Sequence, residues 1–489
     1  MNMKFVHLLL LCLVLLGSSF LSRAADPAPG SVVRVSVTNQ PYDFFQPWMK
    51  KQPFSRRALG TVLPGGKVLV TGELVANATF VEIEKPLSGE KTPATIECVD
   101  YEANLALLKP ADENFLADFK ALEFGEGQVG DRADVLQLEN TGELLVTSAN
   151  LATVEVGRYP LDDTSLLLYR FSMPLQYRDS SFTIPVVKNG RLLAMLQRYD
   201  NRSQTGDGIP AVIIAKFVKD AADGTYDGFP RAGLGFSSTR DPQLRRYIGL
   251  NATGGVFITE MQKDGSAEKA GLQKGDVITS IAGKPIDQDG NYKDTVHGKI
   301  ALQHLVSGVH SVGEKLKVEY IRDGKPATAT LELSRRPPDA SVIPPYLIDK
   351  APRYYILGGL VMQELSRQYL REWGDIKKAP QRLAYYDRFQ ADLFEGKTKR
   401  VVFLSQVLPS PATVGYEQLS YLVITRINDT QIQSLDDVAS AVNKPVNGFH
   451  KIEFDENPGV IYLDAAQVKE LEPALMQNYG IRSMNRLTP

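Results

Sequence analysis

Short apolar runs separated by turn residues fill the sequence from Ser31 to about Val218. The first run, SVVRVSV, alternates an apolar face with a mixed one, which is the period of a half-buried strand. A Pro64-Gly65-Gly66 turn then separates two further apolar runs, as in a hairpin. Because such runs recur without a long helical period, we predict an all-β barrel or sandwich.

The composition is that of a folded protein with several domains. The chain has 489 residues, enough for roughly three domains. Apolar residues make up 43% and charged residues 23%, so each domain can build an ordinary core. The formal net charge is −2, and neither a basic excess nor an acidic tail is present. We therefore predict no nucleic-acid partner.

The first 24 residues have the pattern of a secretory signal peptide. Lys4 and His7 precede the apolar run Leu8–Leu16, and Ser22 and Ala24 supply the small residues that a signal peptidase reads. The apolar run is too short to span a bilayer. We expect cleavage after Ala24 and export to the periplasm or cell envelope, with no integral membrane segment left in the mature chain.

The sequence offers little for redox chemistry or for binding a cofactor. Only Cys98 remains after residue 24, so neither an intramolecular disulfide nor a cysteine-rich zinc site can form. A phosphate loop, a nucleotide fingerprint and a metal-spaced cluster of His, Asp and Glu are also missing from the sequence. We predict no cofactor and no metal site.

Changes in composition divide the chain into successive units. The stretch DAADGTYDGFP reads as a linker, GGVFITEMQKDGSAEKAGLQKGDVITSIAGKPI belongs to a compact αβ module, and SRRPPDASVIPPY is a proline-rich spacer. The last 140 or so residues mix helices and strands, about one further domain. We predict a signal peptide at 1–24, a β-barrel domain at 25–225, an αβ module at 226–336, a linker at 337–350 and a second αβ unit with a helical insertion at 351–489.

Several motifs, taken in order, resemble the HtrA/Deg serine proteases, and most closely the subgroup first described in plants. They are FFQPW, NLALLKPADENF, DGTYDGFPRAGLGF, DPQLRRYIGL, QKGDVITSIAGKPI, HGKIALQHLV, PRYYILGGLVMQELSRQYL, VVFLSQVLPSPATVGYEQL and GIRSMNRL. The resemblance covers almost all of the mature chain. It implies a multidomain protein with an all-β trypsin-like double barrel, followed by two α/β PDZ-like domains. It also implies a trimer-based homo-oligomer.

The positions that match the family's catalytic triad hold other residues. Leu74 stands where the family has its histidine, and Asn104 replaces the acid. Aligned on Pro185, the nucleophile position holds Phe182. If the alignment shifts by one or two residues, Ser181 or Ser180 becomes the candidate nucleophile.

A second observation needs no alignment. A serine hydroxyl without a base is a poor nucleophile at neutral pH. Lys188 is a possible substitute base, but it lies at a turn. No histidine occurs from residue 25 to residue 296, because the five histidines of the chain are His7, His297, His304, His310 and His450. We therefore predict a catalytically degenerate barrel without a His/Asp/Ser triad.

The apolar replacements also suggest how the former cleft is filled. Leu74, Phe182 and Ile184 stand where the parent site is polar. If they meet, they form a hydrophobic cluster in place of unpaired polar groups. We expect Leu74, Asn104 and Phe182 to converge in the folded domain.

The first αβ module carries a candidate peptide site. Its GLGF loop, Gly233, Leu234, Gly235 and Phe236, resembles the PDZ loop whose backbone N–H groups hold a C-terminal carboxylate. The strand after the loop can accept a peptide as an added strand. We expect a helix over Ile300–Val306 to form the other wall, with Ile300 and His304 facing the peptide. An exposed or structural role for His304 is the alternative.

We therefore expect an exported, non-catalytic HtrA/Deg-like protein. Its partners are peptides or unfolded protein segments with free C-terminal carboxylates. Roles as an adaptor, a scaffold or a chaperone-like quality-control factor all follow from the resemblance and stay open. The alternatives are an active serine endopeptidase with a rearranged site, and a regulatory subunit of an active protease paralogue.

Overall fold

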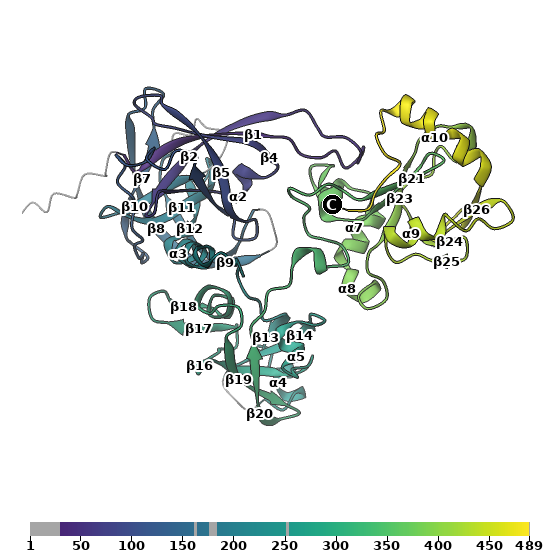
Figure 1. The fold of residues 1–489 in the computed structure, drawn as a ribbon. Coiled ribbons are helices and arrows are strands. Elements are labelled where there is room, and N and C mark those ends of the chain that lie inside the picture. Colours follow the sequence, from purple (N-terminus) through teal and green to yellow (C-terminus); the bar gives the residue numbers. More distant parts are fainter. Residues whose placement is uncertain (1–29, 161–163, 176–182, 251–253, 489) are drawn as a thin grey trace, which may run out of the picture.

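The computed structural model describes residues 30–160, 164–175, 183–250 and 254–488. The proposed signal peptide at 1–24 and the candidate positions Ser180, Ser181 and Phe182 lie outside these residues. Figure 1 shows a β-rich body, a smaller module below it, and a third unit on the opposite side. Within the described ranges, no helix is long and apolar enough to cross a membrane.

The β-rich body contains two closed barrels of six strands each. The first has the order β1-β2-β3-β6-β5-β4, with β1 (Val32–Asn39), β2 (Phe54–Leu63), β3 (Lys67–Val70), β4 (Ala78–Glu84), β5 (Lys91–Asp100) and β6 (Leu105–Pro110). The second has the order β10-β11-β12-β9-β8-β7, with β7 (Arg132–Leu138), β8 (Leu144–Arg158), β9 (Ser165–Ser172), β10 (Ile184–Lys188), β11 (Arg191–Asp200) and β12 (Thr205–Pro210). The predicted all-β double barrel is confirmed.

Alternating side chains explain the first barrel. Val33, Val35 and Val37 of β1 are fully buried, whereas the residues between them reach the surface. Gly60 on the neighbouring strand faces the same interior, and a Cβ there would lie 2.4 Å from Val68 and 2.8 Å from Val35. Only glycine fits this close approach between strands.

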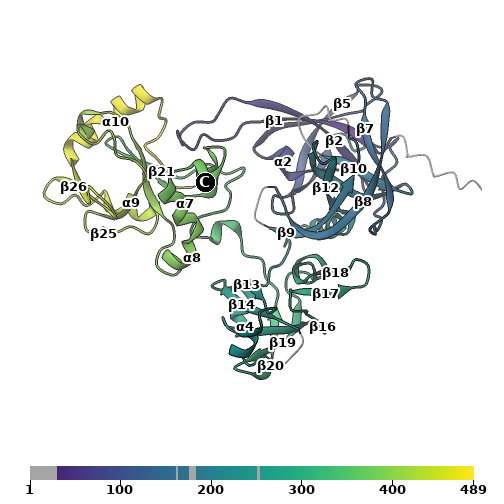
Figure 2. The same cartoon turned by 180° about the vertical axis from the view of Figure 1, so that it is seen from behind.

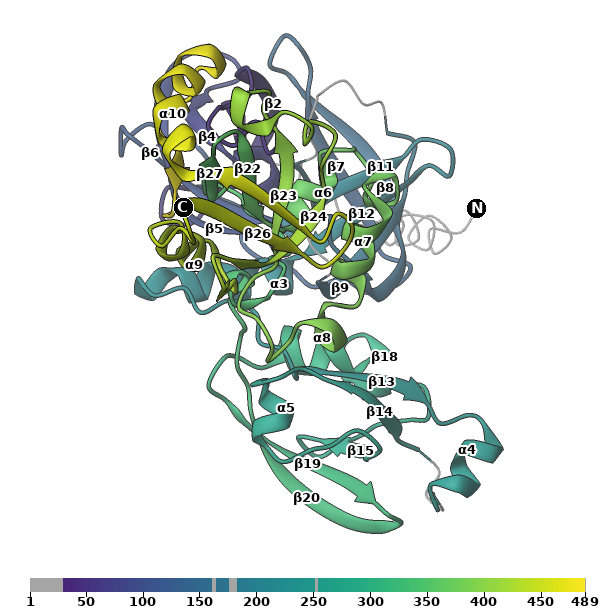
Figure 3. The ribbon, with the colours of Figure 1, turned by 90° about the vertical axis from the view of Figure 1, so that its right-hand side faces the viewer.

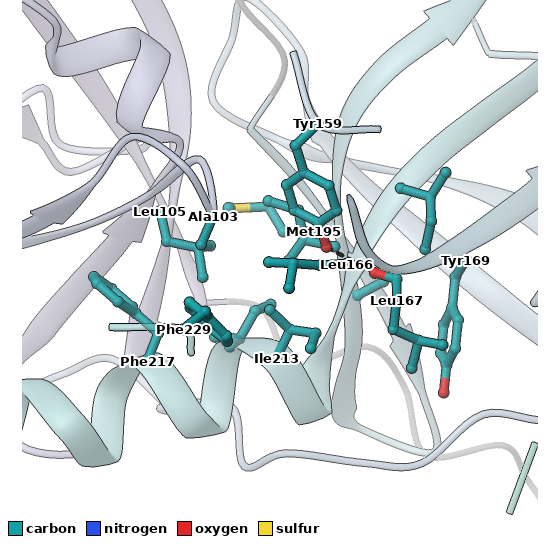
Figure 4. Close-up of a cluster of buried hydrophobic side chains, with 14 of the residues drawn as sticks. Ala103, Leu105, Tyr159, Leu166, Leu167, Tyr169, Met195, Ile213, Phe217 and Phe229 are labelled. Atoms are coloured by element: carbon teal, nitrogen blue, oxygen red, sulfur yellow. Dashed lines mark hydrogen bonds between the residues drawn. The ribbon is translucent and has the colours of Figure 1, made fainter. Parts of the chain in front are cut away.

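One hydrophobic core runs from the second barrel into the module below it (Figure 4). Ile213 and Phe217 of α3 (Ala211–Asp220) face Leu166 and Met195 of the barrel, and Phe229 joins them from the start of the module. The hydroxyl of Tyr159 donates to the carbonyl of Leu167 over 2.7 Å, so its polar end is paired inside this core. Shared burial of this kind holds the module against the barrels.

A buried group of charges adds a second connection, which we call the carboxylate latch. Asp100 and Glu102 lie between β5 and β6, and their side chains are 0% and 4% exposed. Arg335 lies 3.5 Å from Asp100 and 3.6 Å from Glu102, and Arg231 pairs with Glu102 at 3.1 Å. The Tyr226 hydroxyl also donates to Asp100. The latch therefore ties both ends of the module to the first barrel.

The module consists of one sheet, in which five strands follow one another, and a separate hairpin. The path is β13-β14-β15-β19-β20, made of β13 (Leu234–Ser238), β14 (Val256–Met261), β15 (Val277–Ile281), β19 (Lys315–Arg322) and β20 (Lys325–Glu332), with β16 (Lys284–Pro285) beside β15. The hairpin pairs β17 (Asn291–Asp294) with β18 (Gly298–Ala301). The short helices are α4 (Pro242–Tyr247), α5 (Ser266–Lys269) and the π-helical turn η2 (His304–Val309).

The expected helix over Ile300–Val306 is wrong at its start. Ile300 lies in β18, where it pairs with Tyr292 of β17, and both side chains are buried. The hairpin pairing places Ile300 in the core as a strand residue, so the helical turns begin only after Ala301. Sequence spacing alone did not separate this short strand from the helix that follows it.

The third unit is a larger sheet with helices on it. Its path is β27-β26-β24-β23-β22-β21-β28, made of β21 (Tyr354–Leu357), β22 (Leu360–Glu364), β23 (Val402–Val407), β24 (Leu422–Ile427), β26 (Phe449–Phe454), β27 (Val460–Asp464) and β28 (Asn485–Arg486), with β25 (Thr430–Gln431) beside β24. Between β22 and β23 stand α6 (Arg367–Arg371), α7 (Gln381–Arg388) and α8 (Gln390–Leu393), and later come α9 (Leu435–Ala441) and α10 (Ala465–Tyr479).

The loop between β1 and β2 reaches from the first barrel into the third unit, as the view from behind also shows (Figure 2). Phe44 and Trp48 are buried there in two apolar clusters. Gln363 donates to the Phe44 carbonyl over 3.1 Å, and the Trp48 indole donates to the Tyr479 carbonyl over 3.2 Å. The FFQPW motif thus belongs, in its contacts, to the core of the third unit.

The proline-rich segment at 337–350 is also in contact with the folded units. Val342 and Ile343 are buried in the same apolar cluster as Phe44. Asp349 and Asn77 exchange two hydrogen bonds, of 2.6 and 3.1 Å. The segment therefore packs between the first barrel and the third unit.

We expect the carboxylate latch to contribute more to stability than a surface ion pair does. Arg335→Met removes a cation from beside two buried carboxylates. It should therefore lower the free energy of unfolding by about 3–5 kcal/mol. Lys91→Met, which removes surface pairs with Glu82 at 2.8 Å and Glu84 at 3.5 Å, is the matched control and should destabilise the protein far less. Calorimetric unfolding of both variants measures the difference, and equal losses would contradict the role given to the latch.

Candidate functional site

Asn104, which we predict to replace the family's catalytic acid, forms a structural crosslink. Asn104 is fully buried directly before β6, in the left-handed region at φ 55°, which asparagine tolerates better than most residues. Its Oδ1 accepts from the Glu73 N–H at 2.9 Å, and its Nδ2 donates to Gln197 Oε1 at 3.2 Å. Glu73 lies in the short helix α2 (Gly72–Val75), whereas Gln197 lies in β11. Asn104 therefore joins the two barrels.

Leu74, which we predict to replace the family's histidine, is a core residue. Leu74, in α2, is fully buried with Val33, Val70 and Leu108 in the apolar core of the first barrel. Asn104 and α2 are thus brought together, through the bond to Glu73. Ile184 belongs to a different core, that of the second barrel.

The expected cluster of Leu74 with Ile184 is therefore wrong, because each residue packs into the interior of its own barrel. Phe182, the third member, lies outside the described residues.

The described chain resumes at Thr183, next to the candidate nucleophile segment. Thr183 is fully buried, and its hydroxyl donates to the carbonyl of Leu59 in the first barrel. Lys188, the substitute base that the sequence offered, forms an ion pair with Asp131 at 2.6 Å. The Thr183 hydroxyl thus connects the two barrels, and the Lys188 ammonium is engaged in an ion pair.

The GLGF loop lies where a peptide can join the sheet. Gly233 has φ 73°, and a Cβ there would lie 3.2 Å from the Gly265 backbone, so a side chain is disfavoured by torsion and by space. Leu234, Gly235 and Phe236 are half-buried on β13, which is the outer strand of the described sheet. An outer strand can pair with an extended peptide through its backbone.

A cavity of about 1060 Å³ opens beside this loop. Gly233, Leu234, Gly235 and Phe236 line one side, and Leu302, Gln303 and Val306 line another. Lys216 of α3 donates to the Ser307 carbonyl at 2.7 Å, which fixes η2 to the barrel body. Four of the six expected peptide-site residues are therefore brought to one cavity.

The other two, Ile300 and His304, are not among the described residues that line the cavity. His304 is 3% exposed, and its ring lies 5.7 Å from that of His297, which in turn contacts Tyr169 of the second barrel at 5.8 Å. Burial lowers the pKa of His304 to about 4 and also lowers the pKa of His297. Both rings are therefore neutral at neutral pH.

The third unit closes part of the cavity. Arg388, Phe389, Gln390 and Glu395, at and beside α8, contribute to its lining, as do residues of the 337–350 segment. Glu395 pairs with Arg336 at 3.2 Å, and Gln390 Oε1 accepts from the Ile343 N–H at 3.1 Å. Figure 3 shows α8 on the side of the third unit that faces the module with β13. The sequence did not indicate this contact, because α8 and the GLGF loop are far apart along the chain.

The sequence also missed a group of possible metal ligands. Asp294, His297 and His304 offer ligand atoms that all lie within 4.8 Å of one another. Asp294 ends β17, His297 follows that strand, and His304 begins η2, so their sequence spacing matches no familiar ligand motif. The hairpin bends the chain back and brings them together.

Comparison with known proteins identifies the two αβ units. PDZ domain families match residues 230–333 and 343–485. Protease Do-like 2, chloroplastic, from Arabidopsis thaliana is 24% identical over 94% of this chain and 76% of its own length. Protease Do-like 4, mitochondrial, from the same plant is 25% identical over 95% and 86%. Periplasmic serine endoprotease DegP of Escherichia coli K12 is 25% identical over 58% of each chain.

A solved structure agrees with the fold. A variant of the HtrA-type protease AlgW with a decapeptide superposes with a TM-score of 0.51 and 18% identity, covering 65% of this chain and 97% of its own. Its likeness supports a trypsin-like double barrel followed by a PDZ domain. The chain is thus similar to HtrA/Deg proteases, plant Deg members among them, over most of its length, and it carries two PDZ domains after the double barrel.

Proposed function

We propose that this protein is a non-catalytic HtrA/Deg member that binds extended or C-terminal peptide segments in its first PDZ domain. It then acts as an adaptor, a scaffold or a chaperone-like factor in the periplasm or cell envelope, as a trimer-based homo-oligomer. The observation that carries the proposal is the cavity at the GLGF loop, bordered by an outer strand and by η2.

The side chains at the triad positions support the absence of hydrolysis. Proteases of this type need a base that takes the nucleophile's proton and a carboxylate that orients this base. Leu74 is part of a barrel core, and the amide of Asn104 uses both its polar atoms, Oδ1 toward Glu73 in the first barrel and Nδ2 toward Gln197 in the second. No imidazole occurs in the sequence from residue 25 to residue 296. A proton acceptor of the usual kind is therefore missing from the barrel domain.

The geometry of the loop supports peptide binding. Gly233 has a positive φ of 73°, a torsion that occurs in the backbone nests whose N–H groups bind carboxylates. Phe236, half-buried beside the cavity, can pack against the side chain of the last peptide residue. Glu395 of the third unit pairs with Arg336 at the end of the first PDZ domain, and both line the cavity, so a ligand shares this space with the third unit.

We expect the purified chain from Ala25 onward neither to degrade unfolded casein nor to react with a fluorophosphonate probe, because it lacks a base for a serine. An active HtrA-type protease, assayed in parallel, is the positive control. Turnover that disappears in a Ser180→Ala/Ser181→Ala variant would contradict the proposal and favour an endopeptidase. Turnover only in the presence of a co-purifying protease would favour a regulatory subunit.

We expect decapeptides with a free carboxylate to bind more tightly than their C-terminally amidated twins. Gly233→Ala should weaken binding by about tenfold, because a side chain at positive φ costs about 1–2 kcal/mol in the bound loop. Gly324→Ala is the matched control, since Gly324 has the same φ of 73° at the β19–β20 turn, with open space around it. Isothermal titration calorimetry, first with a pool of random decapeptides and then with the peptides that bind most tightly, measures the affinities of both variants. Equal effects of the two variants would contradict a site at the GLGF loop.

We also expect the contact with α8 to limit access. Glu395→Gln weakens its pair with Arg336 and should raise peptide affinity a few-fold, whereas Glu332→Gln, which weakens an exposed pair with Lys315 at 3.5 Å, should not. The same titration measures this effect. Unchanged affinity in Glu395→Gln would show that α8 does not compete with the ligand.

A further inference from the structure

Asp294, His297 and His304 meet where the first PDZ domain contacts the second barrel. Asp294 ends β17, His297 follows in the turn to β18, and His304 begins η2. One ring nitrogen of each histidine and one oxygen of Asp294 lie within 4.8 Å of one another. We call this group the His2Asp cluster.

The two histidines carry unpaired polar atoms. The Nδ1 atoms of His297 and His304 are buried and have no hydrogen-bond partner in the described part of the chain. A buried polar atom that forms no hydrogen bond costs about 1–3 kcal/mol. Two such atoms in one group point to a ligand that would use ring nitrogens there.

The carboxylate is already oriented. Asp294 Oδ1 accepts from the backbone N–H groups of Val296 and His297, both at 2.9 Å, and Oδ2 accepts from the Tyr292 hydroxyl at 3.1 Å. Oδ1 thus uses both of its lone pairs, whereas Oδ2 keeps a second lone pair for a further ligand. Such outer hydrogen bonds are typical of side chains that hold a metal in fixed geometry.

The rings are held by packing as well. His297 lies between Tyr169 and His304, with ring centroids 5.8 and 5.7 Å away. Gly308, one turn along η2, leaves room for the His304 ring, since a Cβ there would lie 2.2 Å from Nδ1. The ring of His304 therefore has one fitted position beside the other two residues.

We propose that the His2Asp cluster binds one divalent transition-metal ion of the zinc class. Two imidazoles and one carboxylate suit zinc, whereas calcium and magnesium prefer oxygen ligands alone. Tetrahedral zinc with bonds of about 2.0–2.1 Å places its ligands about 3.4 Å apart, so the side chains close by roughly 1 Å on binding. The fourth position is left for water. The metal would crosslink the β17–β18 hairpin to η2, the helix that also lines the peptide cavity.

Zinc binding to the full mature chain tests this proposal. Metal-free protein is titrated with zinc chloride against a chromophoric chelator, and cobalt(II) is added separately to record its visible absorption. We expect one zinc per chain and a tetrahedral cobalt spectrum. His297→Gln and Asp294→Asn should each weaken zinc binding by more than about tenfold, the lower end of what even outer-sphere changes cause.

His310→Gln is the matched control, because His310 lies in the same domain but bonds to Glu314 at 2.6 Å. It should bind zinc like the parent chain. Circular dichroism confirms that each variant is folded, and the partly exposed His297 and Asp294 are chosen for that reason. Failure of the folded parent chain to bind zinc, or equal binding by the parent and His297→Gln, would overturn the proposal.

Discussion

Two buried carboxylates, Asp100 and Glu102, fix the arrangement on which the rest of the molecule depends. Buried acids are tolerated only when cations and hydrogen bonds compensate them. Here the compensation comes from Arg231 and Arg335, at either end of the first PDZ domain, and from Tyr226. The barrels and the PDZ domain therefore stabilise each other, and the peptide cavity has a fixed place relative to the barrel body.

The barrels have the trypsin-like architecture, and the two residues that we aligned with triad positions have structural roles. Asn104 stands two residues after Glu102 and joins α2 to β11, and Leu74 fills the first barrel. The loop that carries Phe44 and Trp48 fastens the third unit to the same body. The third unit in turn brings α8 to the cavity, so three parts of the chain border the candidate peptide site.

Local patterns predicted the elements of this fold better than its long-range contacts. The alternation of apolar residues in β1 and the turn at Gly65 predicted the β-barrels, and the resemblance to a known family predicted the PDZ domains. The prediction of a helix at Ile300 was wrong, because a four-residue strand and the following helix share one apolar run. The predicted cluster of Leu74 with Ile184 was also wrong, because the apolar character of Leu74 did not reveal which core it enters. It also missed the His2Asp cluster, since only the hairpin brings His304 to Asp294.

We propose that recognition at the GLGF loop, and not cleavage in the barrels, is the activity of this chain. Hydrogen–deuterium exchange of the mature protein, with and without a saturating free-carboxylate decapeptide, distinguishes the two. We expect new protection of backbone amides in β13 and η2, with no new protection around β10 and β11. Protection confined to the barrel strands on either side of Asn104 and Thr183 would contradict it.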